Sequence, residues 1–213
     1  MAATQLSLYN GALRKLKERK LATLQDNTEA RRLLDDAWSG LVESNLEKAL
    51  WRFARRTMKV TYDTNYTPAF GHKYRFVKPT DFVRTIGVWH DDRLSSPLLQ
   101  YLDEGGYWYS DQPEFYVSFV SSDADYGYNY ALWPKSFEEM IEYDLAYAVC
   151  GRLSNSAVDP DNILKQLKNA ELTAKSNSAM EGPTVVPPTG SWVNARRGRS
   201  GRSDLGGRGQ LIG

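Results

Sequence analysis

The spacing of apolar residues predicts two helices at the start of the chain. Apolar side chains recur at helical intervals over residues 6–16, behind Thr4, a residue type that caps helices. A second apolar stripe predicts a helix over about 28–56. Two residues could cap it: Asp26, in a capping box with the Glu three residues later, or Thr28. At about 1.5 Å per residue, such a helix would be long for a chain of this size.

The apolar period then changes from 3.6 to 2, which predicts strands over about 57–132. Alternation is clear in TMKVTY, KYRFV, FVRTIGVWH and FYVSFV. The segment LLQYLDEGGYWYS contains two strand-like runs joined by Asp103-Glu104-Gly105-Gly106, which indicates a hairpin. This region therefore contains five or six short strands.

Helical spacing returns after Pro134. A last helix is expected to begin at Asp159-Pro160, a capping residue followed by Pro at the first helical position. The predicted fold class is therefore α+β, in which an antiparallel helical bundle from both chain ends carries an inserted small β-rich domain and an extended C-terminal tail. The expected divisions are 1–56 and 134–180 for the two parts of the bundle, 57–133 for the β domain and 181–213 for the tail.

Charge separates the body of the chain from its tail. The 213 residues have a net charge of +1, but the segment from Glu181 to Gly213 carries +3 and the preceding residues carry −2. The tail holds eight of the 16 Gly and five Arg. Binding of nucleic acid over the whole surface of the protein would require a clear excess of basic residues, so the composition argues against such binding. No charge-free apolar run approaches the length of a membrane span, and no secretory signal is evident.

Residues that could support catalysis are few and scattered, so we expect no enzymatic function. The chain has one Cys and two His, which excludes a Cys-based zinc cluster and leaves little for acid–base chemistry. Cys150 falls on an apolar helix face and is interpreted as a core residue. His90-Asp91-Asp92 is interpreted as a polar turn after a strand rather than as a metal site. Phosphate-binding and nucleophile-elbow motifs are absent, so no cofactor or metal is predicted.

Aromatic residues are concentrated between Tyr101 and Trp133. Tyr107 and Tyr109 share one face of a strand and Trp108 takes the other. These rings either fill a small β core or form a protein–protein surface, for which Tyr and Trp are favoured anchors. A platform for stacking single-stranded nucleic acid is less favoured, because the window lacks interleaved Lys and Arg.

The order of these segments resembles that of phage head-to-tail adaptor proteins, the connector proteins of short-tailed phages that are also called tail tubular protein A. The resemblance covers nearly the whole chain and is carried by Asn10-Gly11-Ala12-Leu13, ATLQDNTEARRLLDDAW, LEKALWRFARR, YRFVKPTDFVRTIGVW, GGYWYSD, LWPKSFEEMIEYDLAYAVCGRL and SWVNARRG. It implies a structural virion protein at the head–tail junction, assembled in the host cytoplasm. In such proteins a homo-oligomeric ring of about twelve copies lies beneath the portal, extends the DNA channel and docks the tail nozzle or tube. DNA would pass through the channel without specific binding, and no membrane is involved.

Two sets of residues are candidates for partner contacts in such an adaptor. In the tail, we expect Trp192 to be an apolar anchor on the portal, with Arg196, Arg197, Arg199 and Arg202 supplying positive charge. In the β region, we expect Tyr107, Trp108, Tyr109, Tyr126 and Tyr128 to face the distal tail component. The competing hypothesis is a nucleic-acid-binding protein that uses a disordered Arg/Gly tail.

Overall fold

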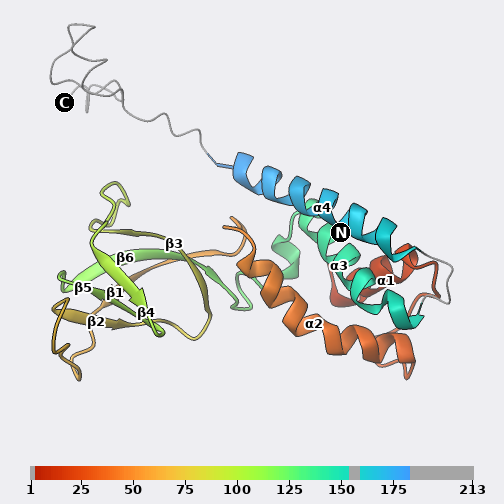
Figure 1. Cartoon of the computed structure of the whole chain (residues 1–213), viewed down its shortest axis with the longest axis horizontal. Helices are drawn as coiled ribbons and strands as arrows, with labels where there is room; N and C mark the ends of the chain where they lie inside the picture. Colours follow the sequence, from red (N-terminus) through yellow and green to blue (C-terminus); the bar gives the residue numbers. More distant parts are fainter. Residues whose placement is uncertain (1–2, 154–158, 183–213) are drawn as a thin grey trace, which may run out of the picture. The chain divides into compact units, whose positions relative to one another are not determined.

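The computed structural model describes residues 3–153 and 159–182, which form a mixed α+β fold with four α-helices and two small antiparallel sheets (Figure 1). The helices are α1 (Gln5–Lys15), α2 (Glu29–Glu47), α3 (Lys135–Leu153) and α4 (Pro160–Met180). Thr4 caps α1 and forms a capping box with Ser7. Pro160 is the first residue of α4, and the Asp159 carboxylate accepts from the Asp161 N–H at 3.0 Å. Both predicted helix starts are therefore confirmed.

Helix α2 begins behind Thr28, as one of the two alternatives predicted, but it is shorter than expected. Asp26 does not cap it, since that carboxylate accepts hydrogen bonds from Ala22 and Thr23 in the preceding loop. The helix ends at Glu47 rather than near Arg56. The indole N–H of Trp51 donates to the Asn45 carbonyl at 2.7 Å, an oxygen that a continuing helix would have used itself.

The apolar residues beyond Glu47 that extended the helical pattern pack as an irregular segment. The rings of Trp51 and Phe53 lie 4.8 and 4.7 Å from the ring of Phe137. From Arg55 the chain enters a strand instead, because its backbone pairs with a distant segment of the chain. Packing therefore ends the helix where the local apolar period would have continued it.

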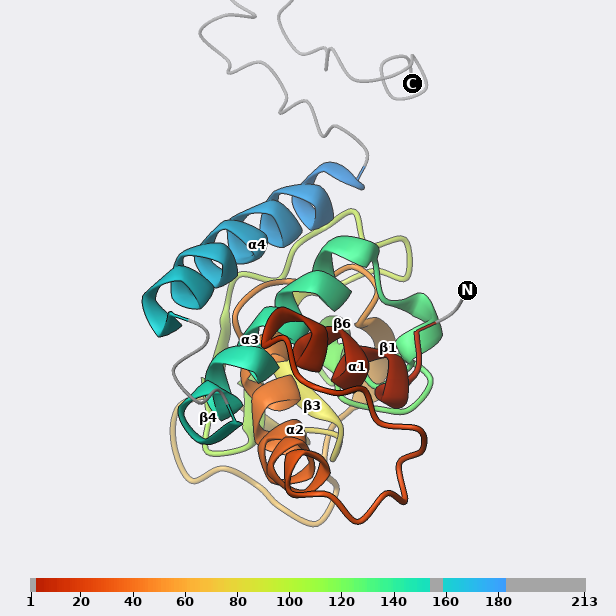
Figure 2. The ribbon, with the colours of Figure 1, turned by 90° about the vertical axis from the view of Figure 1, so that its right-hand side faces the viewer.

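Helices α1, α2 and α3 are joined by one hydrophobic cluster, and Figure 2 shows α1 lying beside α3. Gly11 is the point of close approach, since a Cβ there would come within 2.2 Å of the Glu142 carboxyl. Asn10 holds the loop after α1, because its side chain bonds both the N–H and the carbonyl of Leu21 at 2.7 and 3.1 Å. The Asn-Gly pair of the N-terminal motif thus has a structural role.

Of the five or six strands predicted, six are present: β1 (Arg55–Thr61), β2 (Tyr74–Val77), β3 (Phe82–Trp89), β4 (Tyr101–Glu104), β5 (Tyr107–Ser110) and β6 (Glu114–Ser121). One sheet has the order β1-β6-β3 and the other has the order β2-β5-β4. The β4–β5 hairpin turns at Gly105 and Gly106, whose φ angles of 56° and 84° favour glycine. The predicted hairpin is confirmed.

The two sheets share a second hydrophobic cluster, built around fully buried aromatic rings. The Phe76 ring lies 4.4 Å from the ring of Phe115, and Trp108 is 6.3 Å from the same ring. Alternation along β6 places Phe115, Val117 and Phe119 in this cluster, whereas Val120 belongs to the helical cluster. Strand β6 therefore supplies side chains to both cores.

Asp81 ties the start of β3 to the other two strands of its sheet, β6 and β1. Its carboxylate accepts from the Arg56 guanidinium at 2.8 Å and from the Ser121 hydroxyl, and its carbonyl accepts from the Ser122 N–H at 2.8 Å. Burial opposes the charged form, but the hydrogen bonds from Ser121 and Arg56 outweigh it and lower the pKa of Asp81. This contact network lies at Pro79-Thr80-Asp81, within the segment YRFVKPTDFVRTIGVW.

Candidate interaction surfaces of the β region

Trp108 is a core residue, and its prediction as a partner-facing residue is wrong. Its side chain is 0% exposed and belongs to the β cluster. The indole N–H lies 3.3 Å from the Thr85 hydroxyl and 3.2 Å from the Asp103 carboxylate, so its polar group also has partners within the fold. Pairing with Phe76 on β2 places it on the inward face of its sheet.

The opposite face of the same sheet is partly exposed and carries aromatic and aliphatic side chains together with Arg75 and Glu104. The register places Arg75, Tyr109 and Leu102 in one row across the three strands, and Val77, Tyr107 and Glu104 in the next. Val77 is 57% exposed and Leu102 is 47% exposed. Tyr107 and Tyr109 are both partly exposed, so both lie on an accessible surface.

Arg75 holds part of this face in place by stacking between two aromatic rings. Its guanidinium lies 3.7 Å from the ring centroid of Tyr66 and 4.5 Å from that of Tyr107. It also pairs with the Asp63 carboxylate at 2.5 Å, and this hydrogen bond is the main reason that the pKa of Asp63 is lowered. The loop between β1 and β2 is thereby anchored against the sheet.

This anchored loop and the sheet enclose a shallow hollow of about 170 Å³. It is lined by the loop residues Tyr66, Pro68, Ala69, Phe70, Gly71 and His72, and by Leu102, Glu104 and Tyr109 of the sheet. Phe70 is 91% exposed, which is unusual for a Phe without a partner. We call Tyr66, Phe70, Leu102, Tyr107 and Tyr109 the aromatic face; it can accept an apolar side chain from another protein.

Phe70 was not among the residues predicted from the sequence. It lies between Pro68 and Gly71, in a stretch with loop-forming residues and no alternation. A large ring in such a segment has no strand or helix face to bury it. A Phe in a loop-forming stretch was therefore the sequence feature that could have indicated an exposed apolar side chain.

Tyr126 and Tyr128 do not belong to the aromatic face. They follow β6, where the Tyr126 ring lies 5.7 Å from the Arg56 guanidinium and Tyr128 packs against the helical cluster. Burial, and then the nearby Glu43 carboxylate, raise the pKa of Tyr128 to about 12. The five predicted aromatic residues therefore have four different environments. Trp108 is in the core, Tyr107 and Tyr109 are on a partly exposed sheet face, Tyr126 lies beside Arg56, and Tyr128 packs against the helical cluster.

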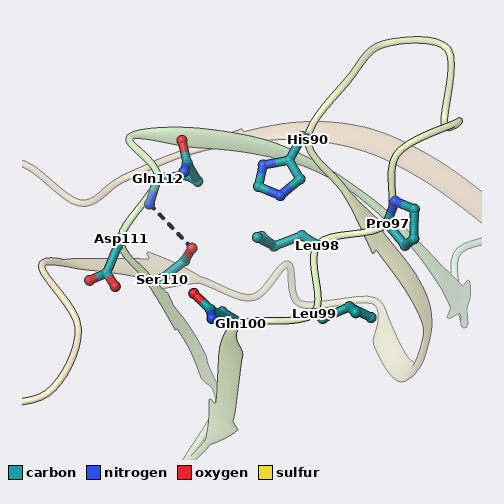
Figure 3. Close-up of a pocket in the computed structure, with 8 residues that line it drawn as sticks. All are labelled: His90, Pro97, Leu98, Leu99, Gln100, Ser110, Asp111 and Gln112. Carbon is teal, nitrogen blue, oxygen red and sulfur yellow. Dashed lines mark hydrogen bonds between the residues drawn. The ribbon is translucent and has the colours of Figure 1, made fainter.

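A hollow of about 280 Å³ beside His90 contains several polar side chains (Figure 3). The Asp111 carboxylate is directed away from the His90 ring and lies 3.5 Å from the His72 ring nitrogen. The backbone N–H of Lys73, followed by His72, lowers the pKa of Asp111. Because the carboxylate in this hollow is bound elsewhere, His90 and Asp111 do not form an acid–base pair.

The residues considered for catalysis have structural roles. Asp91 accepts hydrogen bonds from the Ser95 hydroxyl and the Ser95 and Ser96 N–H groups, which lower its pKa to about 2 and confirm the predicted turn. Cys150 is buried, as interpreted, and its thiol lies 3.1 Å from the Tyr147 carbonyl. Within residues 3–153 and 159–182, no group of three or more His, Cys, Asp or Glu side chains is placed to hold a metal ion.

The tail candidates Trp192, Arg196, Arg197, Arg199 and Arg202 lie outside the described residues. Of the helices that are described, none has the length and apolar character needed to cross a bilayer. Comparison with models of known protein families and with curated protein sequences finds no match to this chain.

Proposed function

We propose that this protein is a structural head-to-tail adaptor of a short-tailed phage. In this proposal the four helices form the ring-building bundle, the two sheets form an inserted β domain, and copies of the chain assemble beneath the portal at the head–tail junction. The observation that carries the proposal is the aromatic face, an anchored apolar surface with 91% exposure at Phe70. An exposed surface of this kind is typical of proteins that function in assemblies.

The aromatic face is proposed to contact the distal tail component. Arg75 and Asp63 hold its loop in place before any partner arrives, so little ordering entropy is lost on docking. This revises the partner-facing set to Tyr66, Phe70, Leu102, Tyr107 and Tyr109, with Trp108 removed because it is buried.

The basic tail is proposed to contact the portal. Its charge of +3 suits an acidic portal surface, and Trp192 provides one large apolar side chain. Many copies in a ring would bind the portal together, so the combined affinity exceeds that of one tail. DNA would pass the −2 body without specific binding, because few phosphate contacts would form.

Native mass measurement of the purified chain, alone and mixed with the portal ring of the same phage, tests the assignment. We expect a closed ring of copies on the portal, even if the free chain is monomeric. If the chain does not join the portal, and instead binds single-stranded DNA or RNA with a steep salt dependence, the nucleic-acid-binding alternative replaces this proposal.

A further inference from the structure

A third hollow, of about 410 Å³, lies where the segment after α2, the end of α4 and strand β3 meet. Its lining is Ala49, Leu50, Arg52, Arg55, Ile86, Lys175, Ser178 and Ala179. Three of these side chains are cationic and none is acidic. Lys175 is already paired with Glu171 at 2.5 Å, so the two arginines carry the net positive charge of the hollow.

Each arginine is positioned by a neutral partner. The Arg52 Nε–H donates to the Ser178 carbonyl at 3.1 Å, and the Arg55 guanidinium donates to the Ser118 hydroxyl at 3.1 Å. In the described part of the chain neither guanidinium forms an ion pair, whereas the adjacent Arg56 pairs with Asp81. A guanidinium has five N–H donors, so both arginines retain donors for an incoming group.

The two positive charges also act on each other. Burial lowers the pKa of Arg55, and repulsion from Arg52 lowers it further. Two neighbouring cations that have no acidic partner among residues 3–153 and 159–182 favour the entry of an anion, because its charge relieves this repulsion.

The remaining lining restricts the kind of anion. Leu50, Ile86, Ala49 and Ala179 provide aliphatic walls beside the arginines, and Leu50 is 47% exposed. A nucleic-acid backbone is recognised by a series of cations along a surface, and the body of this chain carries a net charge of −2. A carboxylate next to an aliphatic side chain fits this hollow, because the carboxylate can accept hydrogen bonds from the two guanidinium groups while the aliphatic side chain contacts the apolar lining.

We propose that this hollow, with Arg52 and Arg55 as its anion-binding residues, captures an acidic side chain flanked by aliphatic residues in a peptide segment of a partner protein. The site differs from the aromatic face and the tail, and it does not depend on the adaptor assignment. In this proposal, the region where α4, the segment after α2 and β3 meet binds a partner separately from the aromatic face and the tail.

Nuclear magnetic resonance of the full chain can test this site, using the Ile86 methyl and Arg55 Nε–H signals. The probe is the peptide acetyl-Gly-Leu-Glu-Leu-Gly-amide, and the matched control replaces its Glu with Gln. We expect saturable shifts of both signals with the Glu peptide, with a dissociation constant of about 1 mM or lower, and none with the Gln peptide.

Arg55→Gln should weaken binding of the Glu peptide by about tenfold or more. Arg55→Lys should weaken it less, because Lys keeps the positive charge but lacks the paired N–H donors of the guanidinium. Arg93→Gln, at an exposed turn, is the matched control and should bind as the unchanged chain does. Methyl spectra of each variant verify the fold. Equal binding of the Glu and Gln peptides, or shifts caused only by a thymidine oligonucleotide, would overturn the proposal. Neither result would bear on whether the chain joins a portal ring.

Discussion

Two adjacent aromatic residues have opposite roles according to the face of the sheet on which each lies. Trp108 and Tyr109 are neighbours in sequence, yet one fills the β core and the other lies on the aromatic face. Strand alternation predicts that they point apart, but not which of the two faces is covered. That assignment depends on the facing sheet β1-β6-β3, whose Phe115 packs against Trp108.

Substitution of these neighbours should therefore give unequal losses of stability. Trp108→Ala is expected to lower the free energy of unfolding by about 3–5 kcal/mol, because it leaves a large cavity in the core. Tyr109→Ala should cost less, since its ring is partly exposed. Urea unfolding measures both, and Trp108→Phe supplies a milder variant if the Ala variant does not fold. A negligible effect of both Trp108 variants would contradict the core assignment.

Asp81 gives a prediction with a defined pH dependence. Asp81→Asn should lower the free energy of unfolding by roughly 1–3 kcal/mol at pH 7, because the bonds to Arg56 and Ser121 lose a charged acceptor. The pKa of Asp81 is lowered in the fold, so its contribution is present above the ordinary Asp pKa of 3.8 and is lost as the pH falls through the folded value.

Urea unfolding at pH 7 and near pH 3 measures this difference. The gap between Asp81→Asn and the unchanged chain should narrow at the lower pH. Asp92→Asn, at an exposed position, is the control and should change little at either pH. A gap that is the same at both values would show that the carboxylate charge is not responsible.

At the element scale, two structural features that look equally local in the sequence have different outcomes. The β4–β5 hairpin forms as predicted because two adjacent glycines at positive φ suit the turn directly. Helix α2 ends nine residues before the predicted end at Arg56, because Trp51 takes a backbone carbonyl and β1 pairs with β6. A turn is determined by its own residues, whereas a helix end can be moved by distant packing.

The hairpin turn can be tested by two substitutions that differ in backbone preference. Gly106→Ala should lower the free energy of unfolding by about 1–2 kcal/mol, since its φ of 84° is unfavourable for a residue with a Cβ. Gly105→Asn should be nearly neutral, because Asn followed by Gly is favoured in such two-residue turns. Thermal and urea unfolding provide the comparison, and equal losses for the two variants would argue against this turn geometry.

At the scale of the whole molecule, stability and partner binding are expected to separate along the chain. The segment Met1–Ala179 is one compact unit, and its described residues contain both hydrophobic clusters. The proposed portal contacts are assigned to the tail beyond it. The aromatic face belongs to the compact unit and is assigned to a different partner.

A chain ending at Met180 should therefore keep the unfolding free energy of the full chain, because it retains both clusters, but lose recruitment to the portal ring. Urea unfolding and co-sedimentation with portal rings measure the two properties. Undiminished ring formation on the portal by the shortened chain would reject the proposed role of the tail.

The aromatic face should behave in the opposite way. Phe70→Ser combined with Leu102→Ser should abolish docking of the tail component while portal recruitment persists, since both side chains are exposed and contribute little to either core. Leu99→Ser, another highly exposed apolar residue outside the aromatic face, is the matched control. Docking that is equally sensitive to Leu99→Ser would contradict the assignment of this surface.

Features that depend on neighbouring residues can be predicted from the amino-acid sequence. Thr4 and Asp159-Pro160 predict two helix starts, and Thr28 is one of the two caps predicted for the long second helix. Alternation predicts five or six strands, and the paired glycines predict the hairpin. Capping, periodicity and turn geometry act over a few residues, so one chain segment contains the information that they need.

Which residues are buried depends on packing between distant segments of the chain. This packing placed Trp108 inside and Phe70 outside, ended α2 at Glu47, and brought Arg52 and Arg55 together with Ile86 and the end of α4. Each of these outcomes depends on contacts between segments far apart in sequence. Local pattern states where a side chain points along its own helix or strand, but burial depends on what lies opposite.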